Sequence, residues 1–211
     1  MKNIKWLLSA ALALASITVS TASFAEKTNF SYTTLSINSG TATYKTPSCA
    51  LGYCMGTVGG ASLGGTIQFA DDLLVASFSS SAVSYSNPAW SYKESDVSLG
   101  LGIVKAIGDK VDVNAGIASL SATAVCSGVI CGTTDDTGMS YGAGLTIGLN
   151  DPKTLVGRIS ISSTKYSKAT KSTETTGLGL GYYVTKNSEL NVSYGTNDVA
   201  SSTTIGYAYH F

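Results

Sequence analysis

The chain offers few side chains that could act together as an enzyme. Its single histidine, His210, is the second-last residue, and no serine or acidic partner can be grouped around it from the sequence. Acid–base and nucleophilic catalysis usually depend on such a group with partners within hydrogen-bond reach. The acidic pairs at 71–72 and 135–136 lack the further oxygen ligands of a calcium site. We therefore predict no enzymatic activity, no metal site and no cofactor.

Four cysteines are the other candidates for chemistry: Cys49, Cys54, Cys126 and Cys131. Four cysteines allow three disulfide connectivities, and the spacing favours the two local pairs Cys49–Cys54 and Cys126–Cys131. A bridge that closes so short a loop contributes only about 2 kcal/mol, so it would stiffen a loop tip rather than hold the fold. A zinc site built from all four thiolates is the alternative. Zinc-binding pairs are usually closer in sequence, and an exported chain meets an oxidising compartment.

The first 25 residues have the layout of a signal peptide. Lys2 and Lys5 precede an uncharged apolar segment, residues 6–19, and Ser23-Phe24-Ala25 supplies small residues for cleavage. The apolar run is shorter than the roughly 20 residues that a membrane anchor helix needs. We therefore expect two parts, a signal peptide over residues 1–25 and an exported domain over 26–211. Loss of the two lysines leaves 11 basic residues against 13 acidic ones, which argues against nucleic-acid binding.

Apolar residues alternate with small or polar residues through much of the exported domain, as in 97–103, 111–117, 139–149 and 205–211. One face of each segment is apolar and aromatic, whereas the other consists of Gly, Ser, Thr, Asn and Ala. A soluble sandwich usually shows charged residues on its second face, while a narrow barrel interior has room only for small side chains. The pattern predicts an all-β fold, a closed antiparallel transmembrane β-barrel whose apolar face contacts lipid.

Turn signals divide the domain into about ten strands, with eight as the alternative if the last hairpin is absent. The expected strands are 28–38, 60–70, 73–84, 96–106, 111–122, 138–149, 154–164, 176–184, 189–195 and 201–211. Tight turns alternate with longer polar stretches, which we interpret as loops at 39–59, 85–95, 123–136, 165–174 and 196–200. In the first strand, Phe30 and Tyr32 have the opposite phase to Leu35 and Ile37, which indicates a bulge.

The end of the chain resembles the closing-strand signal of bacterial outer-membrane β-barrels, the porin-like superfamily. Thr204, Gly206, Tyr209 and Phe211 match that signal in order. The resemblance implies export through the periplasm, insertion into the bacterial outer membrane, and recognition of these four residues by the barrel assembly machinery. It also implies that the partners of the barrel are outer-membrane lipid and lipopolysaccharide.

Two sets of basic residues have a possible role in such a barrel. Arg158 lies between Gly157 and Ile159 in the interior phase, and a charge inside a barrel needs a partner, for which Asp112 and Glu189 are candidates. We interpret it as part of a structural ion pair. A basic stretch in the fourth loop is formed by Lys165, Lys168 and Lys171, and it is either a solvated loop or a contact for lipopolysaccharide phosphates.

The sequence thus favours a non-enzymatic outer-membrane barrel with a structural or surface-interaction role. The small interior side chains leave a narrow passive pore for small solutes as the alternative. A soluble exported β-sandwich of the pilus-subunit type is a further alternative, although its usual single disulfide joins distant strands.

Overall fold

The computed structural model describes residues 29–30, 32–50, 53–69, 73–88, 90–128 and 132–211. These residues form ten strands: β1 (Thr34–Ala50), β2 (Tyr53–Phe69), β3 (Leu74–Ser86), β4 (Trp90–Ile107), β5 (Val111–Gly128), β6 (Thr133–Gly148), β7 (Leu155–Tyr166), β8 (Thr173–Thr185), β9 (Ser188–Thr196) and β10 (Ala200–His210). Within this described part, no helix has the length and apolar character needed to cross a bilayer. The predicted signal peptide, residues 1–25, lies outside it.

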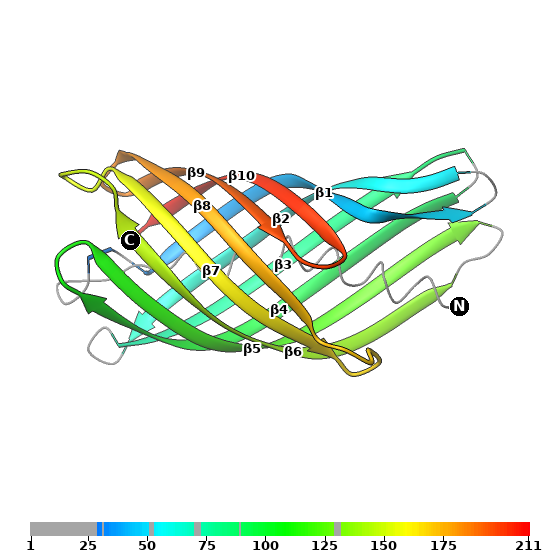
Figure 1. The fold of residues 1–211 in the computed structure, drawn as a ribbon, viewed down its shortest axis with the longest axis horizontal. Coiled ribbons are helices and arrows are strands. Elements are labelled where there is room, and N and C mark those ends of the chain that lie inside the picture. Colours follow the sequence, from blue (N-terminus) through cyan, green and yellow to red (C-terminus); the bar gives the residue numbers. More distant parts are fainter. Residues whose placement is uncertain (1–28, 31, 51–52, 70–72, 89, 129–131) are drawn as a thin grey trace.

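The ten strands close into one antiparallel barrel (Figure 1). Each strand pairs with its neighbours in sequence, and β1 pairs with β10 from Thr34 opposite His210 to Tyr44 opposite Ala200. The last hairpin is present, because Ser201 pairs with Thr196 across β9 and β10. The prediction of a closed barrel is therefore confirmed, with ten strands rather than the alternative eight. Closure gives every strand a paired neighbour on both sides, as a lipid environment requires.

The outer face of the barrel carries large apolar side chains on every strand, and we call this surface the lipid belt. Its members include Leu35, Ile37, Leu63, Ile67, Phe78, Leu99, Leu101, Ile103, Ile117, Tyr141, Ile159, Ile161, Leu178, Leu180, Leu190, Val192, Ile205 and Tyr207, all exposed. So large a contiguous apolar surface is unfavourable in water and marks contact with acyl chains. On β4 the lipid belt runs from Val97 to Ile107. The predicted outward apolar face is thus confirmed.

The seam between the first and last strands depends on a close approach at Gly40. A methyl group at this position would contact the carbonyl oxygen of Thr203 and lie 2.8 Å from the Cα atom of Thr204. Both atoms belong to the backbone of β10 and cannot rotate away. A glycine at this point of β1 therefore lets the two strands pair closely enough to close the barrel.

Three of the predicted long loops are wrong, because their residues extend the strands instead. The stretches 39–59, 85–95 and 123–136 are largely parts of β1 and β2, β3 and β4, and β5 and β6. On β4, the buried side chains of Tyr92, Glu94 and Asp96 alternate with exposed Lys93 and Ser95. The outward residues are polar because this part of the wall lies beyond the lipid belt. The strand continues because its inward side chains still pack.

The predicted bulge in the first strand is also wrong. Phe30 and Tyr32 are buried inside the barrel, whereas Leu35 and Ile37 are exposed on the lipid belt. All four positions are consistent with one uninterrupted alternation, and two aromatic side chains simply face inward near the start of the strand. The inward face therefore also carries large aromatic residues, and not only the polar or small types that the sequence suggested.

The two ends of the barrel differ. One end, which we call the turn end, carries the β2–β3, β4–β5, β6–β7 and β8–β9 connections together with the start of β1 and the end of β10. The opposite end, the loop end, has an oblique rim (Figure 1). β1 continues to Ala50, although its last pair with β10 is at Tyr44. Likewise β6 begins at Thr133, although its pairing with β7 starts at Gly138.

Candidate functional site

The polar and charged side chains that could have a function gather inside the barrel, in the lumen. Near the turn end, the guanidinium of Arg158 on β7 faces the carboxylate of Glu189 on β9. The two Arg158 nitrogens Nη1 and Nη2 donate to the two Glu189 oxygens at 2.5 and 2.8 Å. Both side chains are buried, and such bidentate geometry is the strongest form of this interaction.

His210 joins the same network. Its Nε2 lies 3.1 Å from Oε2 of Glu189, and its ring stacks at a tilt on Tyr183, with 5.0 Å between centroids. Glu189 is fully buried, and its carboxylate pairs with the guanidinium on one side and contacts the imidazole on the other. The arrangement satisfies a buried carboxylate and leaves the single histidine of the chain in a structural contact.

The Arg158–Glu189 pair crosses a strand, which explains why the sequence could not decide between Glu189 and Asp112 as the partner. β8 lies between β7 and β9, and its inward positions opposite the pair are glycines: Gly179 pairs with Arg158, and Gly181 is next along. A methyl group at Gly181 would contact both Glu189 Oε1 and Arg158 Nη1. The absent side chains on β8 therefore make the room in which the ion pair forms.

Asp112, the other candidate partner of Arg158, is engaged elsewhere. Its carboxylate accepts hydrogen bonds from the backbone nitrogen of Asn29 at 3.1 Å and from its side-chain amide at 2.9 Å. Lys153 donates to Asn29 Oδ1 at 2.9 Å, and its ammonium lies 5.9 Å from the ring centroid of Phe30. Asp112 thus holds the segment that precedes β1 against the turn end of the barrel.

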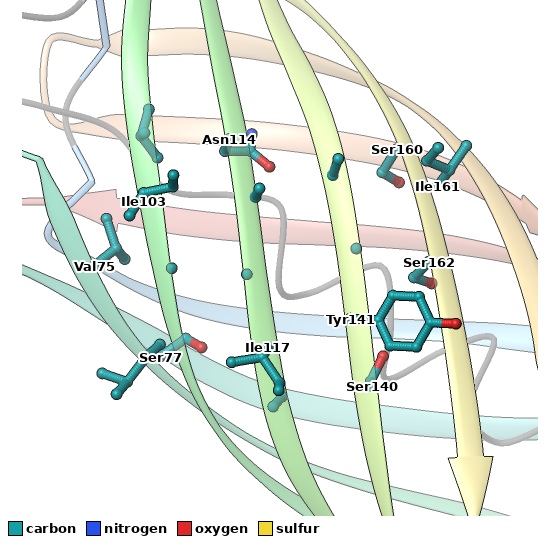
Figure 2. Close-up of a pocket in the computed structure, with 18 residues that line it drawn as sticks. Val75, Ser77, Ile103, Asn114, Ile117, Ser140, Tyr141, Ser160, Ile161 and Ser162 are labelled. Atoms are coloured by element: carbon teal, nitrogen blue, oxygen red, sulfur yellow. The ribbon is translucent and has the colours of Figure 1, made fainter.

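Between β3 and β7, the inward side of the barrel wall is built largely from small residues. A cavity of about 70 Å³ lies along β3 to β7 (Figure 2). Its lining combines inward residues such as Gly102, Gly116 and Ser140 with Leu101 and Tyr141 of the lipid belt. No charged side chain lines it, so this cavity has neither a nucleophile with a base nor a set of metal ligands.

Toward the loop end the lumen is filled by a contiguous apolar group, which we call the outer cluster. Its buried members are Ala42, Tyr44, Val58, Val83, Tyr92, Leu120, Ala122, Ala124, Tyr166 and Ala200. They come from seven of the ten strands, on opposite sides of the barrel. Their contacts therefore span the lumen.

Two acidic side chains are embedded in the outer cluster, and sequence reasoning missed both. Glu94 and Asp96 are 1% and 2% exposed. Tyr92 donates its hydroxyl proton to Glu94 Oε2, and Ser81 donates to Asp96 Oδ2 at 3.2 Å. Among the described residues, the other oxygen of each carboxylate and the Tyr166 hydroxyl have no hydrogen-bond partner. The sequence signal that could have identified them is the spacing of Tyr92, Glu94 and Asp96 at alternate positions, which is typical of a strand and not of a polar loop.

Glu94 lies outside the membrane-spanning part of β4, because the lipid belt on that strand begins at Val97. Burial, followed by the nearby Asp96 carboxylate, raises the pKa of Glu94 well above its usual value, although the bond from Tyr92 opposes the shift. The outer cluster therefore favours a positive partner for this carboxyl group, whether a proton or a cation.

The structure places Cys49, Cys54 and Cys126 at the loop end. Cys49 and Cys54 occupy opposite positions across β1 and β2. Cys126 on β5 is disulfide-bonded, and Cys131 lies outside the described residues. The pairings Cys49–Cys54 and Cys126–Cys131 stay predictions.

The four residues of the closing-strand signal divide between the two faces of β10. Thr204 and Gly206 face the lumen, whereas Tyr209 and Phe211 are exposed outside and pack edge to face at 5.0 Å. A methyl group at Gly206 would contact Oδ1 of Asn38 on β1. The glycine therefore has a packing reason of its own, apart from any role in assembly.

The lysines of the fourth loop are exposed near the end of β7. Lys165 is on the strand, and Lys168 and Lys171 lie in the connection to β8. The Lys168 ammonium donates to the carbonyl oxygen of Asp135, and its backbone nitrogen donates to Asp136 at 3.3 Å. Lys168 thus fixes the loop to β6, while Lys165 and Lys171 project from it.

Comparisons with known proteins identify the fold. No family model matches the chain, and no curated protein matches its sequence. The NanC porin structure matches with a TM-score of 0.52 and 9% identity, over 84% of this chain and 100% of that chain. Ail, the attachment invasion locus protein of Yersinia pestis, matches with a TM-score of 0.44, 16% identity, and coverage of 85% and 99%. The translocator domain of autotransporter NalP from Neisseria meningitidis matches with a TM-score of 0.46 and 14% identity, over 95% of this chain and 93% of that chain. Together with the lipid belt, the likeness to the NanC porin shows that this chain has the fold of outer-membrane β-barrels.

Proposed function

We propose that this chain is a non-enzymatic barrel that acts at the outer surface of the outer membrane, in a structural or surface-interaction role. One observation carries the proposal: the outer cluster spans the lumen toward the loop end. At the other end, Tyr32 and the Arg158–Glu189–His210 network also occupy the interior. A lumen filled at two levels favours a closed barrel over a passive channel.

The strand extensions support a role at the surface. β1, β2, β4, β5 and β6 continue beyond the lipid belt and carry outward polar residues, among them Thr43, Thr57, Lys93 and Thr123. A paired wall of this kind is more rigid than loops of the same length, because its backbone hydrogen bonds are satisfied between strands. It thus presents a fixed polar surface to a partner.

We further propose that outer-membrane lipid and lipopolysaccharide surround the barrel. Exposed Lys165 and Lys171 stand at the loop end, where cationic side chains can pair with lipid phosphates. The proposal includes cleavage of residues 1–25 during export and insertion by the barrel assembly machinery through the β10 signal.

The narrow pore is the second candidate, and the small inward side chains along β3 to β7, with the cavity of about 70 Å³ beside them, favour it. A channel would require a path past the outer cluster. The two functions therefore differ in whether Tyr44, Tyr92 and Tyr166 block passage.

Recording of single channels in a planar bilayer separates them. We expect no conductance steps from the pure, folded wild-type protein. We expect steps from the double variant Tyr92→Ala, Tyr166→Ala, because it removes two large side chains from the outer cluster. Exposed Tyr182→Ala on the outer face of β8 is the matched control and should stay silent. Regular conductance steps from the wild-type protein would overturn the closed barrel in favour of the pore.

A further inference from the structure

We propose that the outer cluster contains a binding site for an organic ammonium cation, formed by the carboxylates of Glu94 and Asp96 and the hydroxyl of Tyr166. The inference goes beyond the proposed function and does not depend on it. A conducting barrel could hold the same site.

The two carboxylates share one face of one strand. Glu94 and Asp96 are two residues apart on β4, so both point into the lumen. On the neighbouring strand β5 they pair with Ala124 and Ala122, whose small side chains leave space beside the carboxylates. Tyr166 belongs to the same cluster, and both carboxylates act electrostatically on its phenol.

Three buried oxygens at this place have no partner among the described residues: Glu94 Oε1, Asp96 Oδ1 and Tyr166 Oη. In that part of the chain, no lysine, arginine or histidine forms an ion pair with either carboxylate. Buried charges without a counter-charge are unfavourable by several kcal/mol. The geometry thus points to a cation that supplies both positive charge and hydrogen-bond donors.

An ammonium group fits this set better than a metal ion. A primary ammonium has three N–H donors, which equals the number of unpartnered oxygens. The rings of Tyr44, Tyr92 and Tyr166 add aromatic faces, which attract organic cations. The described residues contain no group of three His, Cys, Asp or Glu side chains disposed to hold a metal ion. The site lies beyond the lipid belt on β4, so a solute would reach it from the loop end.

Isothermal titration calorimetry on the full chain, refolded in detergent, tests the proposal with n-propylammonium chloride as the probe. Potassium chloride and calcium chloride at equal ionic strength are the comparisons. We expect the wild-type protein to bind n-propylammonium and to bind potassium and calcium more weakly. Glu94→Gln and Asp96→Asn, tested singly, should each weaken binding about tenfold or more, because each removes a charge without changing the shape.

Two further variants separate the site from general effects. Tyr166→Phe keeps the ring and removes only the unpartnered hydroxyl, and it should weaken binding about threefold. Asp135→Asn removes an exposed carboxylate on the outer face of β6, and it should leave affinity within about twofold. Each variant is first checked for a change in gel mobility on boiling, which reports a folded barrel. If a carboxylate variant does not fold, the folded one and Tyr166→Phe decide the result.

The outcomes are distinct. Absence of propylammonium binding by the wild-type protein overturns the inference, and equal binding by Glu94→Gln and Asp96→Asn does the same. Tighter binding of calcium than of propylammonium replaces the ammonium site with a metal site. Neither result bears on channel conductance, so failure of this site and failure of the proposed function are separable.

Discussion

At the scale of single residues, the ion pair of Arg158 and Glu189 shows what a barrel interior demands. Both side chains are buried, and the carboxylate also contacts His210. The pair is possible only because Gly179 and Gly181 leave β8 bare between β7 and β9. A buried charge that loses its partner is far more destabilising than the loss of the whole pair.

Glu189→Gln tests this directly. The substitution leaves the guanidinium of Arg158 buried without a counter-charge, so we expect the free energy of unfolding to fall by about 3–5 kcal/mol. Urea unfolding in phospholipid vesicles, followed by the fluorescence of Trp90, measures the change. The double variant Arg158→Met, Glu189→Leu removes both charges and should lose less stability than Glu189→Gln alone. A single variant as stable as the wild-type protein would show that the pair does not matter for stability.

At the scale of elements, barrel closure rests on the contact between β1 and β10. Gly40→Ala should lower the free energy of unfolding by about 1–3 kcal/mol, because the new methyl group meets the β10 backbone. Gly59→Ala on β2 is the control, since a methyl group there would meet no atom of another part of the chain within 4 Å. The same urea titration compares the two. Equal stability of the two variants would mean that the seam tolerates extra volume.

The last residue of the chain tests the assembly signal separately from stability. Phe211 is among the most exposed apolar side chains of the barrel, and its ring packs on Tyr209. Phe211→Ser should reduce the amount of folded protein in the outer membrane of living cells several-fold, while refolding in detergent changes little. Gel mobility before and after boiling measures both. Equal losses in cells and in detergent would assign Phe211 to stability rather than to assembly.

At the scale of the whole molecule, the lipid belt defines how the barrel sits in its membrane. Leu101→Arg places a charge in the middle of the belt and should lower the free energy of unfolding in vesicles by about 2–4 kcal/mol. Ser95→Arg lies on the same face of the same strand but beyond the belt, and it should cost at most about 1 kcal/mol. Equal effects at the two positions would contradict the position of the belt.

Much of this architecture could be predicted from the sequence, because the alternation of two residues is a local signal. It identified a closed barrel and its ten strands. It failed where the outward residues become polar, so the extensions around Lys93 and Ser95 were interpreted as loops. The choice between Asp112 and Glu189 as the partner of Arg158 depended on packing across non-adjacent strands, which no local pattern encodes. Glu94 and Asp96 were missed because they were assigned to a loop or to its edge.

The oblique rim of the loop end has a consequence for access. On the side of β9 and β10 the wall stops near the height of Ala200, whereas β1 and β2 rise above it (Figure 1). The mouth of the barrel therefore faces sideways over its shorter strands. A molecule that diffuses along the membrane surface meets a lower rim on the side of β9 and β10 and a higher wall on the side of β1 and β2. Approach to the interior therefore depends on direction.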